Sequence, residues 1–230
     1  MPDFLNLVND QCLGFHQFKE LQESDSHEGM VVPGFWESIR SHFDGASMRA
    51  LKESGEDNLY LLRHFYYASC WNMSDGENAL MWKAYAPAGV AIKTSVGKLM
   101  NAALTAPSAM VGQSTIEYAD HWSELEARGY VHDQIPLNWL FLHAKRRAFA
   151  TEAEVRFHVQ PPARFTQRED GRILADPDDC SSWCLVTFET LDWIDEIVTA
   201  PSTSSWAAKP IERLTKEKGL CFRASGLGAM

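Results

Sequence analysis

The sequence predicts an α+β fold, in which residues 1–230 form a single domain with a mixed or antiparallel sheet flanked by helices. Three observations lead to this fold class. The 230 residues are 45% hydrophobic and 23% charged, which is typical of a globular protein with one sizeable core. Strand and helix patterns are mixed along the chain. They follow no regular βαβ period, which argues against a doubly wound parallel sheet.

The N-terminal third carries short helix and strand patterns. Residues 4–8 resemble the last turns of a helix, and residues 12–18 alternate as a strand does. The polar segment 23–29 predicts a loop. Apolar residues recur at helical spacing over 35–51, with one interruption, and residues 66–73 predict a buried strand.

The middle of the chain predicts a helix over 77–85 with Ser74 or Asp75 as its N-cap, because both residue types accept hydrogen bonds from the first turn. A strand over 90–94 and a helix over 96–104 follow. Further along, we expect a strand at 115–118, an exposed helix at 121–129, an amphipathic helix at 137–150 and a strand at 155–159, in that order.

The C-terminal part begins with a segment rich in proline and glycine, 160–179, which predicts a hairpin or loop excursion. Strands are expected at 184–188 and 194–199. The last predicted element is a helix over 206–218, which Gly219 ends.

Composition excludes several classes of function. The net charge of −10 leaves no broad positive field, so nucleic acid is not an expected partner. No stretch of 18 uncharged apolar residues and no signal-peptide pattern is present, so no membrane partner is expected. Five scattered cysteines without metal-ligand spacing indicate a reduced, cytoplasmic protein, with no metal expected.

The densest charged run begins at Lys145 and Arg146 and ends at Arg156, with Glu152 and Glu154 between them. If a strand covers this end of the run, both glutamates and Arg156 share one face of it. A carboxylate pair beside cations suits the stabilisation of a developing positive charge. The alternative is a solvated strand edge with ordinary ion pairs.

A second segment runs from a strand containing Ser69 and Trp71, through a polar turn, into a helix containing Trp82 and Tyr85. The start of this helix presents free N–H groups that suit a phosphate or carboxylate. The alternative is that the aromatic side chains belong to the core. His143, on the apolar side of its predicted helix, is expected to be a core histidine. The chain contains no Gly-x-Ser-x-Gly, P-loop or Gly-x-Gly-x-x-Gly motif.

Taken in order, these elements resemble the bacterial domain-of-unknown-function family 2971 over nearly the whole chain. The residues that carry the resemblance are Asp25-x-His27-Glu28-Gly29, Cys70-Trp71 with Glu77 and Met81-Trp82, Gly89-Val90-Ala91-Ile92, Ile116-x-Tyr118-x-Asp120, Lys145-Arg146-x-x-Phe149-x-x-Glu152-x-Glu154-Val155-Arg156, Pro201 with Trp206, and Ser225-x-Leu227. The Met-Trp pair and the Lys-Arg…Glu-x-Glu-Val-Arg run are the most specific of them.

The resemblance implies an architecture similar to that of ADP-ribosyltransferases, with NAD as substrate and a role in defence or as a toxin. By this analogy Glu154 is the catalytic carboxylate and Glu152 its companion. The cofactor-binding side chains would be those of Ser69, Trp71, Trp82, Tyr85, Lys145, Arg146 and Arg156. In the family an Arg-bearing strand usually precedes the first helix; here it is either missing or replaced by groups such as His16.

Two other functions are compatible with the sequence. One is a non-catalytic interaction module with an acidic surface. The other is a metal-dependent nucleic-acid enzyme in which Glu28, Glu77, Glu152 and Glu154 act with Lys145 around a divalent ion. The substrate, the macromolecular target and the oligomeric state are not predicted by the sequence.

Overall fold

The computed structural model describes residues 2–24, 32–39, 63–106, 110–130, 142–160, 165–167, 173–175 and 181–227. Helices and strands are mixed along the chain, which confirms the α+β fold class. The chain divides into two compact units. Unit 1 comprises residues 1–14, 74–111 and 185–230, and unit 2 comprises residues 15–73 and 112–184. Each unit is described by itself.

Unit 1 contains a small sheet in the order β12-β11-β3. The central strand β11 (Glu196–Thr199) pairs antiparallel with β3 (Val90–Lys93) and parallel with β12 (Phe222–Ala224). The helices of this unit are α1 (Pro2–Asp10), α5 (Ala79–Tyr85), α6 (Val96–Thr105) and α9 (Ser205–Glu217).

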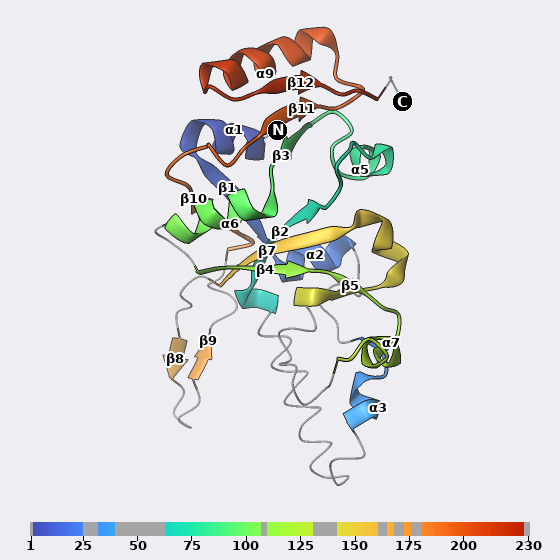
Figure 1. Cartoon of the computed structure of the whole chain (residues 1–230). Helices are drawn as coiled ribbons and strands as arrows, with labels where there is room; N and C mark the ends of the chain where they lie inside the picture. Colours follow the sequence, from blue (N-terminus) through green and yellow to red (C-terminus); the bar gives the residue numbers. More distant parts are fainter. Residues whose placement is uncertain are drawn as a thin grey trace. The chain divides into compact units, whose positions relative to one another are not determined.

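Helix α9 runs along β12 (Figure 1) and buries Ile211 and Thr215. Its end confirms the prediction from the sequence, because Gly219 has a φ of +73°, the left-handed conformation that glycine adopts without strain. In the part of the chain that the structure describes, no helix has the length and apolarity needed to cross a membrane.

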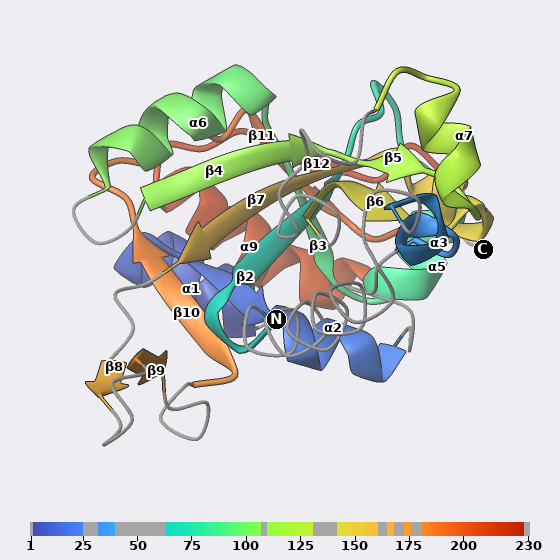
Figure 2. The ribbon, with the colours of Figure 1, turned by 90° about the horizontal axis from the view of Figure 1, so that it is seen from below.

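Unit 2 is built on a sheet in the order β10-β1-β2-β7-β4. Its central strands are β2 (Tyr67–Asn72) and β7 (Glu154–Gln160), which pair antiparallel; β2 also pairs antiparallel with β1 (Cys12–Gln17). The outer strands of the sheet are β10 (Trp183–Thr187) and β4 (Met110–Thr115). Strands β1, β4 and β10 each include residues of both units. Figure 2 shows β2, β7 and β4 side by side, so β7 has a neighbour along both edges.

Short elements complete unit 2. They are α2 (Phe18–Ser24), α3 (Phe35–Ile39), the strands β5 (Glu117–Tyr118) and β6 (Ala144–Lys145), α7 (Trp122–Glu126), the 3-10 helix η2 (Arg147–Glu152) and the hairpin of β8 (Phe165–Gln167) with β9 (Ile173–Ala175). This hairpin confirms the excursion predicted for 160–179. The rings of Phe35 in α3 and Trp122 in α7 meet edge to face, with their centres 5.0 Å apart, in a buried cluster to which both helices contribute.

The amphipathic helix predicted over 137–150 is wrong within the described residues. Of the described residues there, 142–143 are α-helical; strand β6 and the 3-10 helix η2 follow, and 137–141 lie outside the described residues. Strand β6 pairs in parallel with β5, and the Lys145 carbonyl accepts a hydrogen bond from the Ala119 N–H at 3.0 Å. Pairing with a distant strand therefore overrides the helical spacing of apolar residues.

Three smaller predictions are also corrected. The strand predicted at 115–118 is two strands, β4 and β5, separated at Ile116. Helix α5 is capped by Asn78, whose side chain accepts from the N–H groups of Leu80 and Met81. Helix α7 is not exposed throughout, since it buries Trp122 and Leu125. The predictions for 25–29 and 40–51 lie outside the described residues.

Candidate functional site

Strand β7 carries two buried, oppositely charged side chains at its start. Glu154 is 3% exposed and Arg156 is 0% exposed. Side chains alternate along a strand, so Glu154, Arg156 and His158 share one face, while Val155 and Phe157 lie on the other. The alternative of a solvated strand edge is therefore wrong, because β7 is an interior strand whose charged face is covered.

The charges of this face form a closely spaced cluster. The Arg156 Nε donates to Glu154 at 2.5 Å, and the Lys145 Nζ lies 3.0 Å from Glu154 Oε2. The same ammonium lies 2.6 Å from Glu152 Oε2. The Lys145 and Glu152 side chains are only 10% and 12% exposed. The structure thus brings together four of the predicted residues around one shielded group of charges.

A sharp turn creates this arrangement. Glu152 ends η2, and Ala153 has a φ of 42°, in the left-handed region that is unfavourable for residues with a Cβ. The Ala153 carbonyl accepts from the Met73 N–H at 2.7 Å, and the Asn72 side-chain amide donates to the Glu152 carbonyl. The prediction that Glu152 lies on the strand with Glu154 is wrong. The turn at Ala153, held by the end of β2, is what places both carboxylates beside Lys145.

Glu154 remains ionised at ordinary pH. Burial raises its pKa, but the charge and hydrogen bonds of Arg156, the charge of Lys145 and a hydrogen bond with Cys70 lower the pKa to about 2. Such a carboxylate is not a proton donor near neutrality. It is a fixed negative charge, suited to stabilising a positive charge that develops next to it.

Tyr118, on β5, contributes a hydroxyl to the same cluster. Its oxygen accepts the backbone N–H of Glu154 at 2.8 Å, and burial raises the pKa of the phenol. The Tyr118 hydroxyl therefore stays protonated and fixes the first residue of β7.

Cys70, rather than Ser69 or Trp71, faces this cluster from β2. In the β2–β7 register Cys70 lies opposite Arg156, whereas Ser69 and Trp71 lie opposite Phe157 and Val155, on the other face of the sheet. The Trp71 ring packs edge to face on Phe157, 6.4 Å away, and its indole N–H donates to the Ser69 hydroxyl at 3.0 Å. The structure therefore does not bring Ser69 or Trp71 to Glu154. Cys70 is exposed and marks the solvent side of the cluster.

The remaining predicted residues have other surroundings. Trp82 and Tyr85 belong to unit 1, whereas Glu154 belongs to unit 2. Trp82 is 5% exposed and packs with Val198 and Ala200, while Tyr85 is 64% exposed. Arg146 lies just before η2, where its guanidinium stacks 5.3 Å from the centre of the Phe149 ring.

A second buried group continues the charged face along unit 2. The Ser114 hydroxyl is 3.0 Å from His143 Nε2, and Ser114 is 1% exposed. Burial and the charge of Arg156 lower the pKa of His143 to about 4. Burial and the electrostatic interactions with His143 and Arg156 lower the pKa of His158 to about 4 as well. Both rings are neutral at pH 7. His143 was expected to be a core histidine; the structure has it hydrogen-bonded to Ser114 but only partly buried.

Of the acidic residues proposed for a metal site, Glu152 and Glu154 lie together in unit 2, where both contact Lys145. Glu77 lies in unit 1, where its carboxylate accepts from Arg223 at 2.7 Å, from the Gly226 N–H at 2.8 Å, and from Ser225 and Trp82. These bonds outweigh its desolvation and lower the pKa of Glu77 to about 2. Glu28 lies outside the described residues. Among those described, no three His, Cys, Asp or Glu side chains are grouped to hold an ion.

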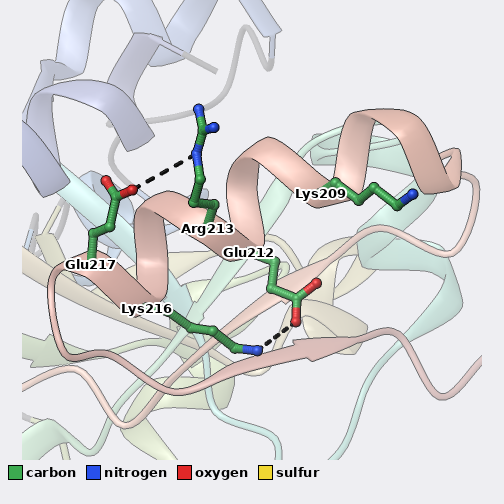
Figure 3. Close-up of a pocket in the computed structure, with 5 residues that line it drawn as sticks. All are labelled: Lys209, Glu212, Arg213, Lys216 and Glu217. Atoms are coloured by element: carbon green, nitrogen blue, oxygen red, sulfur yellow. Dashed lines mark hydrogen bonds and ion pairs between the residues drawn. The ribbon is translucent and has the colours of Figure 1, made fainter.

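A shallow hollow in unit 1 lies over α9 (Figure 3). It is lined by Lys209, Glu212, Arg213, Lys216 and Glu217. Within it Lys216 pairs with Glu212 at 2.7 Å, and Arg213 with Glu217 at 3.8 Å. All five side chains come from one helix, and four of them form two solvent-exposed ion pairs, so this hollow is a weaker candidate than the buried charges of unit 2.

Cys70 and Tyr118 are the site residues to which the sequence assigned no role. Both stood in the segments that carry the family resemblance, but their proximity to Glu154 depends on strand register. The sequence contained one signal for Cys70: side chains alternate along a strand, so Cys70 must lie on the face opposite to that of Ser69 and Trp71.

No protein-family model matches the chain, and no curated protein or solved structure is significantly similar to it.

Proposed function

We propose that this protein is an ADP-ribosyltransferase-like enzyme that uses NAD as its substrate and Glu154 as its catalytic carboxylate. One observation carries the proposal: Glu154 is a buried carboxylate with a pKa of about 2, hence a negative charge that persists at every physiological pH. The resemblance to the bacterial domain-of-unknown-function family 2971, and the defence or toxin role implied with it, supports the same function.

The proposed reaction breaks the bond between ribose C1′ and the nicotinamide nitrogen. The bonding electrons leave with nicotinamide, which departs neutral, and positive charge develops on the ribose. Glu154 stabilises that charge, and Glu152, the more exposed of the two carboxylates, accepts a hydrogen bond from a ribose hydroxyl. A nucleophile of the target, or water, then bonds to C1′ and releases its proton.

One observation favours a second function, a non-catalytic interaction module. Arg156 and Lys145 both engage the Glu154 carboxylate in this structure. Through these two ion pairs the Glu154 carboxylate also stabilises the junction between η2 and β7. In that case Glu154→Gln changes stability and leaves partner binding unchanged.

The experiment measures nicotinamide release from NAD and transfer of labelled ADP-ribose to lysate proteins. We expect activity in the wild type and a loss of at least about 100-fold in Glu154→Gln, since the replaced charge stabilises the transition state. Because Glu154→Gln leaves Arg156 buried beside a neutral group, the thermal midpoint is measured in parallel. Glu152→Gln keeps the Glu154–Arg156 pair and should lose about 10-fold in activity without unfolding.

Glu117→Gln is the matched control. Glu117 is also a glutamate of unit 2 that is paired with a cation, Arg128, but it is one-third exposed. Its replacement should leave nicotinamide release unchanged. If the folded wild type neither binds NAD in calorimetry nor releases nicotinamide, the enzymatic proposal fails and the interaction module replaces it.

A further inference from the structure

Lys145 contacts both carboxylates of the charged cluster. Its ammonium lies 2.6 Å from Glu152 and 3.0 Å from Glu154. The backbone of Lys145 is fixed, since its carbonyl accepts from the Ala119 N–H and β6 pairs with β5. The ammonium also lies 4.7 Å from the centre of the Phe149 ring. This side chain is therefore fixed on several sides.

We propose that Lys145 is a positioning residue: its ammonium is an internal counter-ion that holds the carboxyl groups of Glu152 and Glu154 together. This revises the cofactor-binding role that the sequence assigned to Lys145. A lysine that is 10% exposed and already bonded to two carboxylates is poorly placed to receive a phosphate. The inference concerns the site of the proposed function, but it rests on that function only for the activity measurement.

The physical basis is the repulsion between two carboxylates that share one shielded site. Without a cation between them, one of two neighbouring acids takes up a proton well above its usual range. Arg156 pairs with Glu154, and Lys145 pairs with both acids, so Lys145 places a second positive charge directly against Glu152. The charged and titratable groups that interact with the ammonium are Glu152 from η2, Glu154 from β7 and Tyr118 from β5. Arg156 from β7 and Cys70 from β2 act on the Glu154 carboxylate that the ammonium contacts.

The test uses three variants of the full chain: Lys145→Met, Lys145→Arg, and Lys145→Met combined with Glu152→Gln. The carboxyl groups are followed by NMR of ¹³C-labelled glutamate during a pH titration, with Glu152→Gln and Glu154→Gln used for assignment. In Lys145→Met we expect the pair to take up its first proton about 1–3 pH units higher than in the wild type. Lys145→Arg keeps the positive charge and should titrate as the wild type does.

The double variant separates charge balance from simple packing. Removing Glu152 together with Lys145 leaves Glu154 with Arg156 and no second acid, so Glu154 should again titrate near its wild-type range. The matched control is Lys98→Met, which removes a lysine from an exposed pair with the single acid Asp195. It should leave both titrations unchanged. If nicotinamide release is detectable, its pH profile should move with the NMR titration in Lys145→Met.

Two results would overturn the proposal. One is an unchanged titration of the carboxylate pair in folded Lys145→Met. The other is a double variant that titrates as abnormally as Lys145→Met. If Lys145→Met alone does not fold, the double variant and Lys145→Arg still test the proposal. Charge balance requires both of them to fold and to titrate near the wild-type range, so failure of either would overturn it. Since the titration needs no substrate, its outcome is independent of whether the protein acts on NAD.

Discussion

At the scale of a single residue, Arg156 shows why the charged cluster is stable in a buried position. Its guanidinium is completely buried, bonds to Glu154 two residues earlier on the same strand, and lies 5.4 Å from the centre of the Phe18 ring. Removing one partner of a buried ion pair leaves an uncompensated charge, which typically destabilises a protein by about 3–5 kcal/mol. Glu154 and Arg156 are therefore each needed for the other to be buried.

Trp82 gives a prediction at the same scale. Its ring is buried in the core of unit 1 and its indole N–H donates to Glu77 at 2.9 Å. Trp82→Ala should lower the free energy of unfolding by about 3–5 kcal/mol, because it leaves a large cavity. Urea denaturation measures this change. Trp206, which is 78% exposed, is the control, and Trp206→Ala should stay within about 0.5 kcal/mol. A loss below 1 kcal/mol in Trp82→Ala would contradict its place in the core.

At the scale of an element, helix α5 shows how a capping residue defines where a helix begins. The Asn78 side chain accepts from the Leu80 N–H at 2.9 Å and from the Met81 N–H at 3.4 Å. Asn78→Ala removes this acceptor and should lower the free energy of unfolding by about 1 kcal/mol in urea denaturation. Asp75→Ala, at a position that the sequence offered as the cap, should change it by less than about 0.5 kcal/mol. If Asp75→Ala lowered the free energy of unfolding more than Asn78→Ala does, the cap would be Asp75.

Strand β7 is the element whose surroundings depended most on tertiary structure. The alternation of residues 155–159 predicted the strand correctly, and the structure has it over Glu154–Gln160. The sequence left open whether its charged face met solvent or other side chains. The neighbours β2 and β4 cover the two edges of the strand, and the charged face is buried because Tyr118, Lys145 and Phe18 pack against it. Contacts between such distant parts of the chain are decided by tertiary structure.

At the scale of the whole molecule, the buried titratable groups predict loss of stability in acid. The folded-state pKa of His143 and of His158 is about 4, below the ordinary value of 6.5. Between these values the unfolded chain binds protons that the folded chain does not, so stability falls as pH drops from 6.5 to 4. Glu77 and Glu154, each with a pKa of about 2, add a second loss as pH falls from 4.5 to 2.

Thermal unfolding midpoints measured from pH 7 to pH 3 test this prediction. The wild type should lose stability steadily below pH 6.5. A His143→Gln/His158→Gln double variant should have a flatter curve between pH 6.5 and 4, because the two protons are no longer taken up on unfolding. Equal slopes in the two proteins over that interval would show that other groups control the acid response.

The sequence by itself determined the fold class, most of the strands, the C-terminal helix with its glycine stop, and the Lys145–Arg156 segment as the place where charge accumulates. These depend on local periodicity and on the conformations that single residues allow, which a short window contains. Tertiary structure alone decided that 144–145 form a strand and 147–152 a 3-10 helix in place of one long α-helix, that Cys70 rather than Ser69 faces Glu154, and that one ammonium joins two carboxylates. Each of these follows from which strands pair and in which register, and that choice is made by the burial of residues far apart in the chain.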